Sequence, residues 1–156
     1  MSLAKFDPID LQILRELQDD GRMTNVELAQ RVGLTAPPCL RRVRALEEAG
    51  IVRSYHAHLD AAKLGYGITV FAMVSLKSQA ESDLQAFEDY VGGLPEVREC
   101  YMLNGEIDFM LKVVARDLQS FQSFLTSRLT AAPNVSSVKT SLTIRTAKQL
   151  SGVPVD

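Results

Sequence analysis

Three arginines, Arg41, Arg42 and Arg44, occupy three of four consecutive positions in the segment TAPPCLRRVRALEEAG, residues 35–50. A guanidinium carries a fixed fork of donors that matches phosphate oxygens, so a cluster of this kind on one face of a helix is suited to nucleic acid. The net charge of the whole chain, −2, does not point to a polyanionic partner. Residues 31–58 do, because they hold five arginines against two glutamates.

A helix through this segment would separate the arginines from the apolar side chains. At about 100° per residue, Arg41 and Arg44 lie opposite an apolar arc, and Arg42 lies on its flank. The arc contains Cys39, Leu40, Val43 and Leu46. A basic helix face in isolation is more often only solvated surface, so its interpretation depends on the neighbouring elements.

A second candidate for chemistry is the segment LNGEIDF, residues 103–109. Asn104 and Gly105 form the dipeptide favoured in a tight hairpin turn, because both tolerate positive φ. Asp108 follows, and Leu103 precedes the turn. A small zwitterion could bind here, with its ammonium facing Asp108 and its carboxylate facing the backbone N–H groups of the turn. From these residues alone, a solvated hairpin is the simpler interpretation.

The elements before the arginines match those of a DNA-binding motif. Residues 7–21, DPIDLQILRELQDDG, have apolar residues at helical spacing and predict a first helix. TNVE, residues 24–27, is a capping box that begins a second helix, and Gly33 suits the left-handed residue that ends it. The arginine helix follows at once, so the arrangement predicts a helix-turn-helix whose second helix enters the major groove.

The arginine helix has its own start signals. Thr35 suits the N-cap position, and Pro37 and Pro38 fall in the first turn, where a missing backbone N–H costs no intrahelical hydrogen bond. After this helix, IVRSYHAHL, residues 51–59, predicts an extended segment in which Arg53 acts as a wing or a DNA-backbone contact. We expect the six positions Thr35, Pro37, Pro38, Arg41, Arg44 and Arg53 to form the DNA-binding surface.

Residues 68–146 alternate strand and helix patterns in the order βαββαβ. This order predicts a ferredoxin-like α+β sandwich, in which two helices cover one face of a four-stranded antiparallel sheet. Each helix has an apolar stripe that we expect to pack in the core: Leu84, Phe87 and Val91 in one, and Leu118, Phe121 and Leu125 in the other. The uncovered sheet face predicts a homodimer. Bulky residues available to the two faces are Phe71, Met73, Tyr101 and Met110.

Composition excludes several classes of protein. The longest mostly apolar run, residues 68–76, is too short to span a bilayer, and the N-terminal MSLAKFDP lacks the apolar core of a signal peptide, so a cytoplasmic protein without a membrane partner is expected. Cys39 and Cys100 have no CxxC or Cys/His spacing, so we expect reduced thiols, no metal site and no cofactor.

Residues 7–52 resemble the winged helix-turn-helix of the leucine-responsive and asparagine-regulatory (Lrp/AsnC) transcription factor family. Arg42 stands where that family typically carries an arginine in its recognition helix, so the resemblance implies Arg42 as a seventh DNA-binding position. The pattern V-x6-NG-x-x-D-F, from Val97 to Phe109, resembles the effector-sensing motif of the same family. The resemblance implies residues 1–60 as a winged helix-turn-helix domain with a linker strand, and residues 61–156 as a ferredoxin-like domain for ligand binding and oligomerisation. It also implies that Leu103, Asn104, Gly105 and Asp108 bind a small amino acid between dimers of an octamer or similar assembly.

The expected function is therefore a transcriptional regulator that binds specific sequences in double-stranded DNA in response to a small amino acid, and not an enzyme. Three other classes stay open. Siroheme decarboxylases resemble the same two-domain architecture and could use His56 or His58. An architectural protein would bind DNA without sequence preference and ignore amino acids. A ligand-binding module that has lost DNA binding would keep LNGEIDF but show no salt-dependent affinity for duplex.

Overall fold

The computed structural model describes residues 6–150 and 152–156, and these fall into two compact units. The first contains the described residues up to His58 together with those from Lys148 onward, and the second is Leu59–Ala147. The sequence had suggested a single boundary near residue 60. The residues from Lys148 onward instead group with the N-terminal unit, because they contact its first helix.

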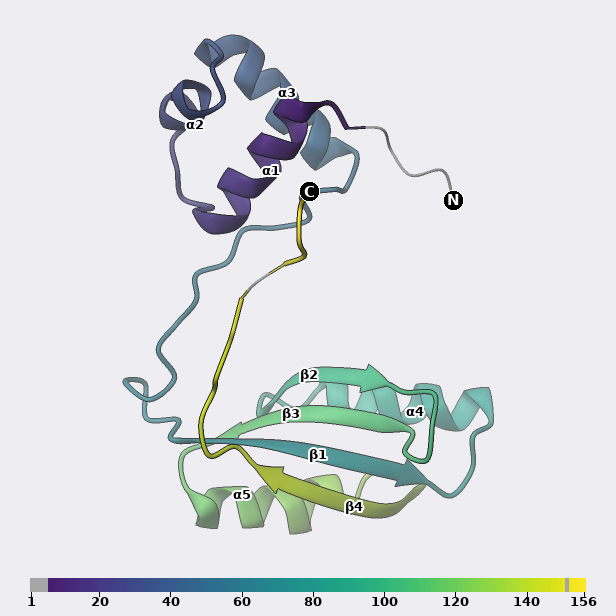
Figure 1. Cartoon of the computed structure of the whole chain (residues 1–156). Coiled ribbons are helices and arrows are strands. Elements are labelled where there is room, and N and C mark those ends of the chain that lie inside the picture. The colour runs from purple at the N-terminus through teal and green to yellow at the C-terminus, as the bar shows by residue number, and fades with distance from the viewer. Residues whose placement is uncertain (1–5, 151) are drawn as a thin grey trace. The chain divides into compact units, whose positions relative to one another are not determined.

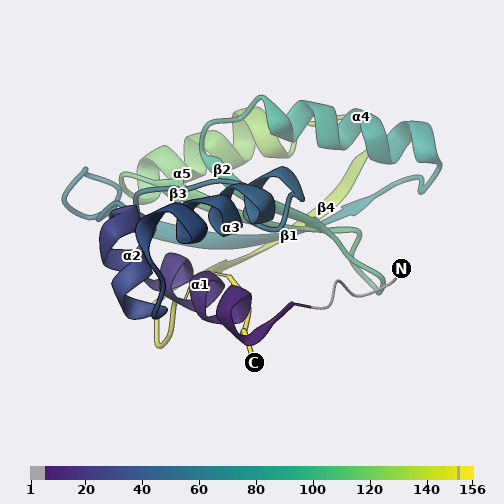
Figure 2. The same cartoon turned by 90° about the horizontal axis from the view of Figure 1, so that it is seen from above.

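The first unit is built from three helices, α1 (Pro8–Asp19), α2 (Asn25–Arg31) and α3 (Ala36–Glu48) (Figures 1 and 2). Each helix buries one stripe of apolar side chains against the other two. The buried core consists of Ile13, Leu28, Ala29, Val32, Cys39, Val43 and Leu46. The predicted inner position of Cys39 is confirmed, since its side chain is 0% exposed. Leu40, placed at the edge of the apolar arc, is 36% exposed instead.

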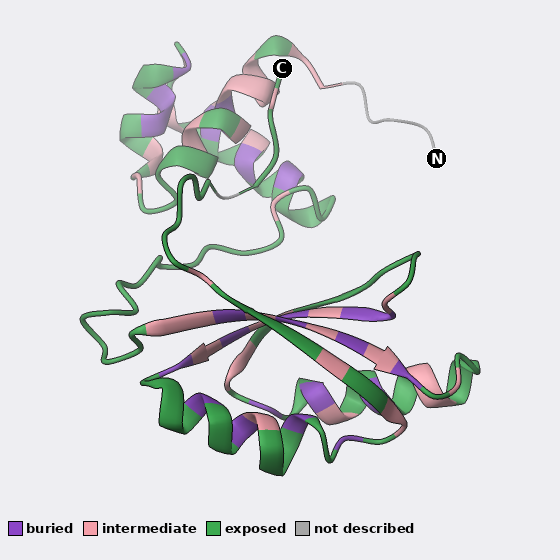
Figure 3. Ribbon diagram, turned by 60° about the horizontal axis from the view of Figure 1, so that its bottom comes forward, coloured by how far each residue is buried: buried purple, intermediate pink, exposed green. Residues whose placement is uncertain are grey.

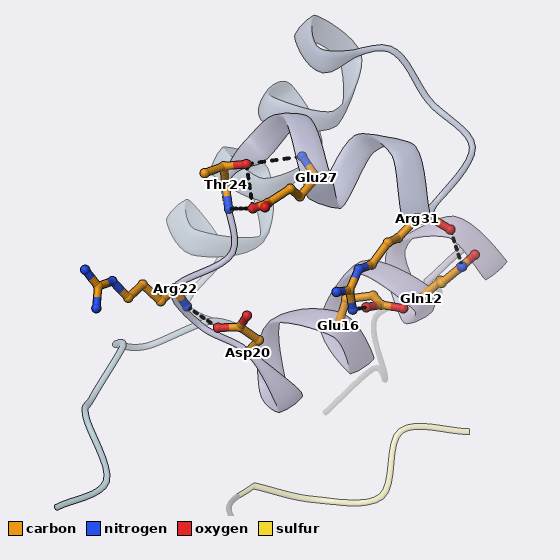
Figure 4. Close-up of polar contacts among 7 residues, drawn as sticks. All are labelled: Gln12, Glu16, Asp20, Arg22, Thr24, Glu27 and Arg31. Atoms are coloured by element: carbon orange, nitrogen blue, oxygen red, sulfur yellow. Dashed lines mark hydrogen bonds and ion pairs between the residues drawn. The ribbon is translucent and has the colours of Figure 1, made fainter.

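The signals that start and end α2 act as predicted. The backbone N–H of Thr24 donates to Glu27 Oε2 at 2.8 Å, and the N–H of Glu27 donates to Thr24 Oγ1 at 3.2 Å, which completes the capping box (Figure 4). Gly33 has φ +69°, a conformation that a side chain would strain, so the chain turns sharply there into α3.

Polar contacts fix α2 against both of its neighbours. Arg31 forms an ion pair with Glu16 of α1 at 2.8 Å, and Gln12 of α1 donates to the Arg31 carbonyl oxygen at 2.8 Å (Figure 4). At the other end of α2, Asn25 Nδ2 donates to the carbonyl oxygen of Ala36, in the first turn of α3, at 2.8 Å. The angle between the two helices of the helix-turn-helix is therefore held by hydrogen bonds as well as by the core.

The segment after α3 differs from the predicted wing strand. Within the described residues 49–67, no strand is assigned. A backbone N–H needs a neighbouring strand to form a ladder, and this segment pairs with no strand in the described part of the chain. The side chain of Tyr55 holds this segment against the helices. Its hydroxyl donates to Glu47 Oε1 at 2.8 Å. Its ring packs so close to Gly21 that a Cβ on that residue would lie 3.1 Å from the ring.

The second unit is a four-stranded antiparallel sheet with helices on one face (Figures 1 and 3). Its elements are β1 (Ile68–Leu76), α4 (Glu81–Gly92), β2 (Val97–Met102), β3 (Phe109–Ala115), α5 (Leu118–Phe124), a π-helical turn (Leu125–Leu129) and β4 (Val135–Leu142). The strands lie in the order β2-β3-β1-β4. The predicted βαββαβ sequence and ferredoxin-like sandwich are confirmed.

Alternate residues of β1 and β3 point into the core beneath α4 and α5. Phe109 of β3 stacks with Phe87 of α4 at 4.7 Å between ring centroids, and both side chains are fully buried. In the second helix the predicted stripe is partly wrong. Leu118 is 62% exposed, whereas Phe124 and Leu129 are buried. The π-helical turn widens the helix after Phe124, which brings the residue five positions later to the core face.

The last strand, β4, pairs with β1. Val138, Thr140 and Leu142 pair with Val74, Ala72 and Val70, which face the core, so all three lie on the helix-covered side. Ile144 lies beyond the end of β4 at Leu142 and is 97% exposed.

Candidate functional site

The outer face of α3 carries two arginines whose side chains are exposed. Arg41 and Arg44 are exposed, and neither takes part in an ion pair with any residue that the structure describes. At the start of the same helix, Thr35 is the N-cap residue, but its side chain makes no capping hydrogen bond to the described backbone. The hydroxyl and both guanidinium groups are available to an external acceptor, and phosphate oxygens are acceptors of the right kind.

Arg42 lies between them in sequence but is turned back onto α1. Its Nη1 donates to Asp7 Oδ2 at 2.6 Å and to Asp10 Oδ1 at 2.7 Å. These hydrogen bonds raise the pKa of Arg42, and the bond to Asp10 has the larger effect. The pKa of Asp7 is lowered, chiefly by the backbone N–H of Asp10 and next by Arg42. The sequence predicted a DNA contact for Arg42. The structure instead gives it two internal carboxylate partners, because the flank of α3 lies against the N-terminal turn of α1.

The remaining predicted DNA-binding positions are also on the surface of the first unit. Pro37 is exposed and Pro38 is half-buried in the first turn of α3. Arg53 is exposed in the segment that follows the helix, with no ion pair to any described residue. His56 and His58 are exposed in the same segment, and His56 Nε2 lies 2.8 Å from the hydroxyl of Ser54.

One basic residue of this unit was missed from the sequence. Arg22 lies in the turn before α2, and its side chain extends away from the helices into solvent (Figure 4). Its backbone N–H donates to Asp20 Oδ1 at 3.0 Å, and its side chain makes no hydrogen bond to any described residue. The signal that could have found it is an arginine two residues before the capping box that begins at Thr24, since the N-terminus of α2 presents further N–H donors nearby.

The connection between β2 and β3 is longer than the predicted two-residue turn. It spans residues 103–108 and is closed by the N–H of Leu103, which donates to the carbonyl oxygen of Asp108 at 2.8 Å. The positive-φ residues of the described chain include neither Asn104 nor Gly105, so the tight-turn prediction is wrong. A six-residue loop closes the hairpin without the left-handed conformations that a two-residue turn requires. Leu103, Asn104 and Gly105 are all exposed.

Asp108 is buried, contrary to the solvated hairpin carboxylate that the sequence suggested. Its side chain is 8% exposed and accepts two hydrogen bonds from the end of β1 and the segment beyond it. The N–H of Leu76 donates to Oδ2 at 2.7 Å, and Gln79 Nε2 donates to Oδ1 at 2.8 Å. The backbone N–H of Asp108 also donates to the Val74 carbonyl oxygen at 3.0 Å. Asp108 therefore ties the hairpin to β1.

An open hollow of about 370 Å³ lies between α4 and β2. It runs along the edge strand as far as Met102, the residue before the hairpin loop. Its lining mixes charged and apolar side chains, with Glu88 and Arg98 among them. In the part of the chain that the structure describes, no group of three or more His, Cys, Asp or Glu residues could hold a metal ion, and no helix is long and apolar enough to cross a membrane.

Comparison with known proteins identifies both units. Residues 6–53 match the model of the winged helix-turn-helix DNA-binding family, and residues 69–153 match that of the Lrp/AsnC ligand binding domain. A helix-turn-helix unit joined to a ligand-binding unit of this kind defines a transcriptional regulator. The chain belongs to the Lrp/AsnC family.

Relatives match along nearly the full chain. A leucine-responsive regulatory protein of Rhizobium meliloti (strain 1021) is 55% identical over 152 residues, which cover 97% of both chains. The Bkd operon transcriptional regulator of Pseudomonas aeruginosa is 42% identical and covers 98% of this chain and 100% of its own. Among solved structures, a Neisseria meningitidis transcriptional regulator in complex with L-Met superposes with a TM-score of 0.93 at 36% identity, covering 97% of this chain and 98% of that one.

These comparisons bear out the expected function and fold class. The protein is a transcriptional regulator that combines a helix-turn-helix with a ligand-binding domain of the Lrp/AsnC type, and the relatives named above are transcriptional regulators. The siroheme decarboxylase and architectural alternatives are not favoured by any of these matches.

Proposed function

We propose that the outer face of α3 enters the major groove of duplex DNA, with Arg41 and Arg44 at phosphates or base edges. The observation that carries this proposal is the contrast within one helix: Arg42 is paired with two carboxylates, whereas Arg41 and Arg44 have no described ionic partner and face solvent. Exposed guanidinium groups retain all their donors for a ligand, and a helix of this kind fits the groove.

Residues on either side of α3 would add contacts that position the protein on the duplex and do not read the DNA sequence. The Thr35 hydroxyl, at the N-terminus of the helix, makes no capping hydrogen bond within the described residues, and Pro37 and Pro38 shape the first turn. Arg53 follows the helix, and Arg22 precedes α2. Such residues around a recognition helix typically bind the sugar-phosphate backbone and fix the register of the protein on the duplex.

We also propose that the loop of residues 103–108 binds a small amino acid as effector. The complex of the Neisseria meningitidis relative with L-Met supports an amino acid as the ligand class. Leu103, Asn104 and Gly105 are exposed and would provide backbone groups for the ligand. Asp108 fixes the shape of the loop from the buried side through Leu76, so its role is that of a positioning residue.

We infer that two copies of the chain pair through the sheet face that carries no helices. The strand register supports this, because Met73, Met110 and Tyr101 lie directly opposite one another across three strands, and Phe71 lies on the same face. Lys112 and Glu99 form an ion pair of 2.8 Å beside them. A face with three bulky half-buried residues and one exposed tyrosine has the composition of an interface core. We expect these dimers to assemble further into an octamer or similar assembly, and we expect the protein to act in the cytoplasm.

Two measurements on the full chain test these proposals. A thermal-shift screen of the twenty amino acids should give a raised melting temperature for at least one, since a ligand that binds only the folded state must stabilise it. The best amino acid is then added to a titration of duplex DNA from the promoter of the protein's own gene. A change in affinity on addition supports a regulator that responds to its effector. Absence of any stabilisation by all twenty amino acids would contradict the effector proposal.

A further inference from the structure

Helix α1 carries two polar side chains, Arg15 and Gln18, on its outer face, and both bind the C-terminal tail of the chain. The tail comprises the described residues 152–156, and its end lies beside α1 (Figures 1 and 2). Arg15 and Gln18 are three residues apart in the helix, so they lie on the same face and one turn from each other. Neither contributes to the core of the helical unit, and both are exposed.

Within the described residues, the side-chain hydrogen bonds of Arg15 and Gln18 all join backbone groups of the tail. Gln18 Nε2 donates to the carbonyl oxygen of Val153 at 2.8 Å, and the N–H of Val153 donates back to Gln18 Oε1 at 3.1 Å. Arg15 Nε donates to the carbonyl oxygen of Val155 at 2.8 Å. The amide of Gln18 thus pairs with one residue through both its donor and its acceptor, as a neighbouring β-strand would.

The spacing of the two partners matches the helix. Two residues of extended chain span about 7 Å, and three residues of α-helix rise about 4.5 Å, a difference that the long arginine side chain can bridge. Pro154 lies between the two tail residues. Its fixed φ and its restriction of Val153 to extended conformations reduce the entropy that the tail loses on docking, and its missing N–H is not required by any contact.

Gly152 adds a second, independent requirement. Its φ is +77°, a conformation that side chains rarely adopt, and a Cβ at this position would overlap the side-chain amide of Gln18. The tail can therefore reach Gln18 only with glycine at residue 152.

We propose that the Arg15/Gln18 face of α1 is a binding site for extended polypeptide backbone and that residues 152–155 of the same chain occupy it. The helical unit is then tethered to the sheet unit by two chain segments, the linker before β1 and the tail after β4. Recognition is through main-chain groups, so it depends on the backbone conformation that Gly152 and Pro154 impose and not on the valine side chains, of which Val153 is 66% exposed.

Amide hydrogen exchange of the C-terminal peptide in the full chain tests this site. The Val153 amide should exchange about fivefold faster in Gln18→Ala than in the wild type, because it loses its only acceptor on α1. Gly152→Ala should have the same effect without any change to the helix. Gln30→Ala, which removes an exposed glutamine from α2, is the matched control and should exchange as the wild type does.

Folding of the variants is monitored by their helical circular dichroism, which surface substitutions of this kind should leave unchanged. Equal exchange of the Val153 amide in the wild type, Gln18→Ala and Gly152→Ala would overturn the proposal, because the tail would then be undocked in all three. The exchange measurement uses neither DNA nor an amino acid, so its result does not depend on the proposed function.

Discussion

Arg42 of α3 donates from a single nitrogen, Nη1, to Asp7 Oδ2 at 2.6 Å and to Asp10 Oδ1 at 2.7 Å. Asp7 is the N-cap of α1 and Asp10 lies in its first turn, so one arginine joins the recognition helix to the start of another helix. Both carboxylates also lie at the positive end of the α1 dipole. Arg42 thus orients α3, and the two neighbouring arginines are left for the ligand.

Replacing Arg42 with Ala should lower the melting temperature of the helical unit more than replacing Arg41 with Ala does. Arg42→Ala leaves two carboxylates close together without their shared cation, whereas Arg41 has no described ionic partner to lose. Thermal unfolding of the two variants, followed by helical circular dichroism, makes the comparison. Equal melting temperatures would contradict the orienting role of Arg42.

The Arg42 contact should also weaken in acid. The pKa of Asp7 lies below its usual 3.8 in the folded protein. The hydrogen bond from the backbone N–H of Asp10 is the largest cause, and the hydrogen bond from Arg42 is the next. The stabilisation it contributes is therefore present above about pH 3.8 and is lost as the pH falls through the lowered folded pKa. The difference in melting temperature between the wild type and Arg42→Ala should shrink over this range. A difference that does not change below pH 3.8 would show that the ion pair is not its source.

Asp108→Ala should destabilise the sheet unit by about 1.5–3 kcal/mol, the usual cost of losing hydrogen bonds to a charged group. Its loss leaves the buried N–H of Leu76 without an acceptor. Gln79→Ala, which removes only the more exposed donor, should cost less. Urea unfolding of both variants measures the two costs. A cost for Asp108→Ala well under about 1 kcal/mol, as for a surface substitution, would mean that the carboxylate is solvated.

Tyr55 should titrate in strongly alkaline solution, because its pKa is raised to about 12. The larger cause is burial, and the next is the hydrogen bond to Glu47. The folded protein then keeps a proton that the unfolded chain has already lost. Stability from this group is fully present below the unfolded pKa of about 10 and is lost as the pH rises through the folded value. Phenolate absorbance of the wild type, minus that of Tyr55→Phe, should show one tyrosine with a midpoint near 12. A midpoint near 10 would mean that Tyr55 does not bind Glu47 in solution.

The local features of the fold were predictable because their causes are close together in sequence. The capping box needs only Thr24 and Glu27, and the turn into α3 needs only Gly33. Strand and helix order in the second unit likewise follows from short-range apolar periodicity. These signals were enough to predict the helix-turn-helix and the βαββαβ sandwich.

The roles of two charged residues were not predictable, since their partners are far away in the chain. Arg42 binds carboxylates 35 and 32 residues before it, and Asp108 binds Leu76, 32 residues before it. Periodicity places a residue on a face but does not identify what packs against it. The burial of Leu129 was not predictable for a related reason, because the π-helical turn of Leu125–Leu129 changes the register of the stripe in a way that a regular 3.6-residue period does not anticipate.

The most direct test of DNA binding by α3 is the salt dependence of duplex affinity for the variant Arg41→Ala/Arg44→Ala. Each phosphate contact that is lost should reduce the slope of log affinity against log salt by about one unit, so we expect weaker binding and a slope smaller by up to about two units. Arg128→Ala, which removes an exposed arginine from the sheet unit, and Pro37→Ala, which changes no charge, should both keep the wild-type slope. If the double variant binds duplex with the affinity and slope of the wild type, the outer face of α3 does not contact DNA.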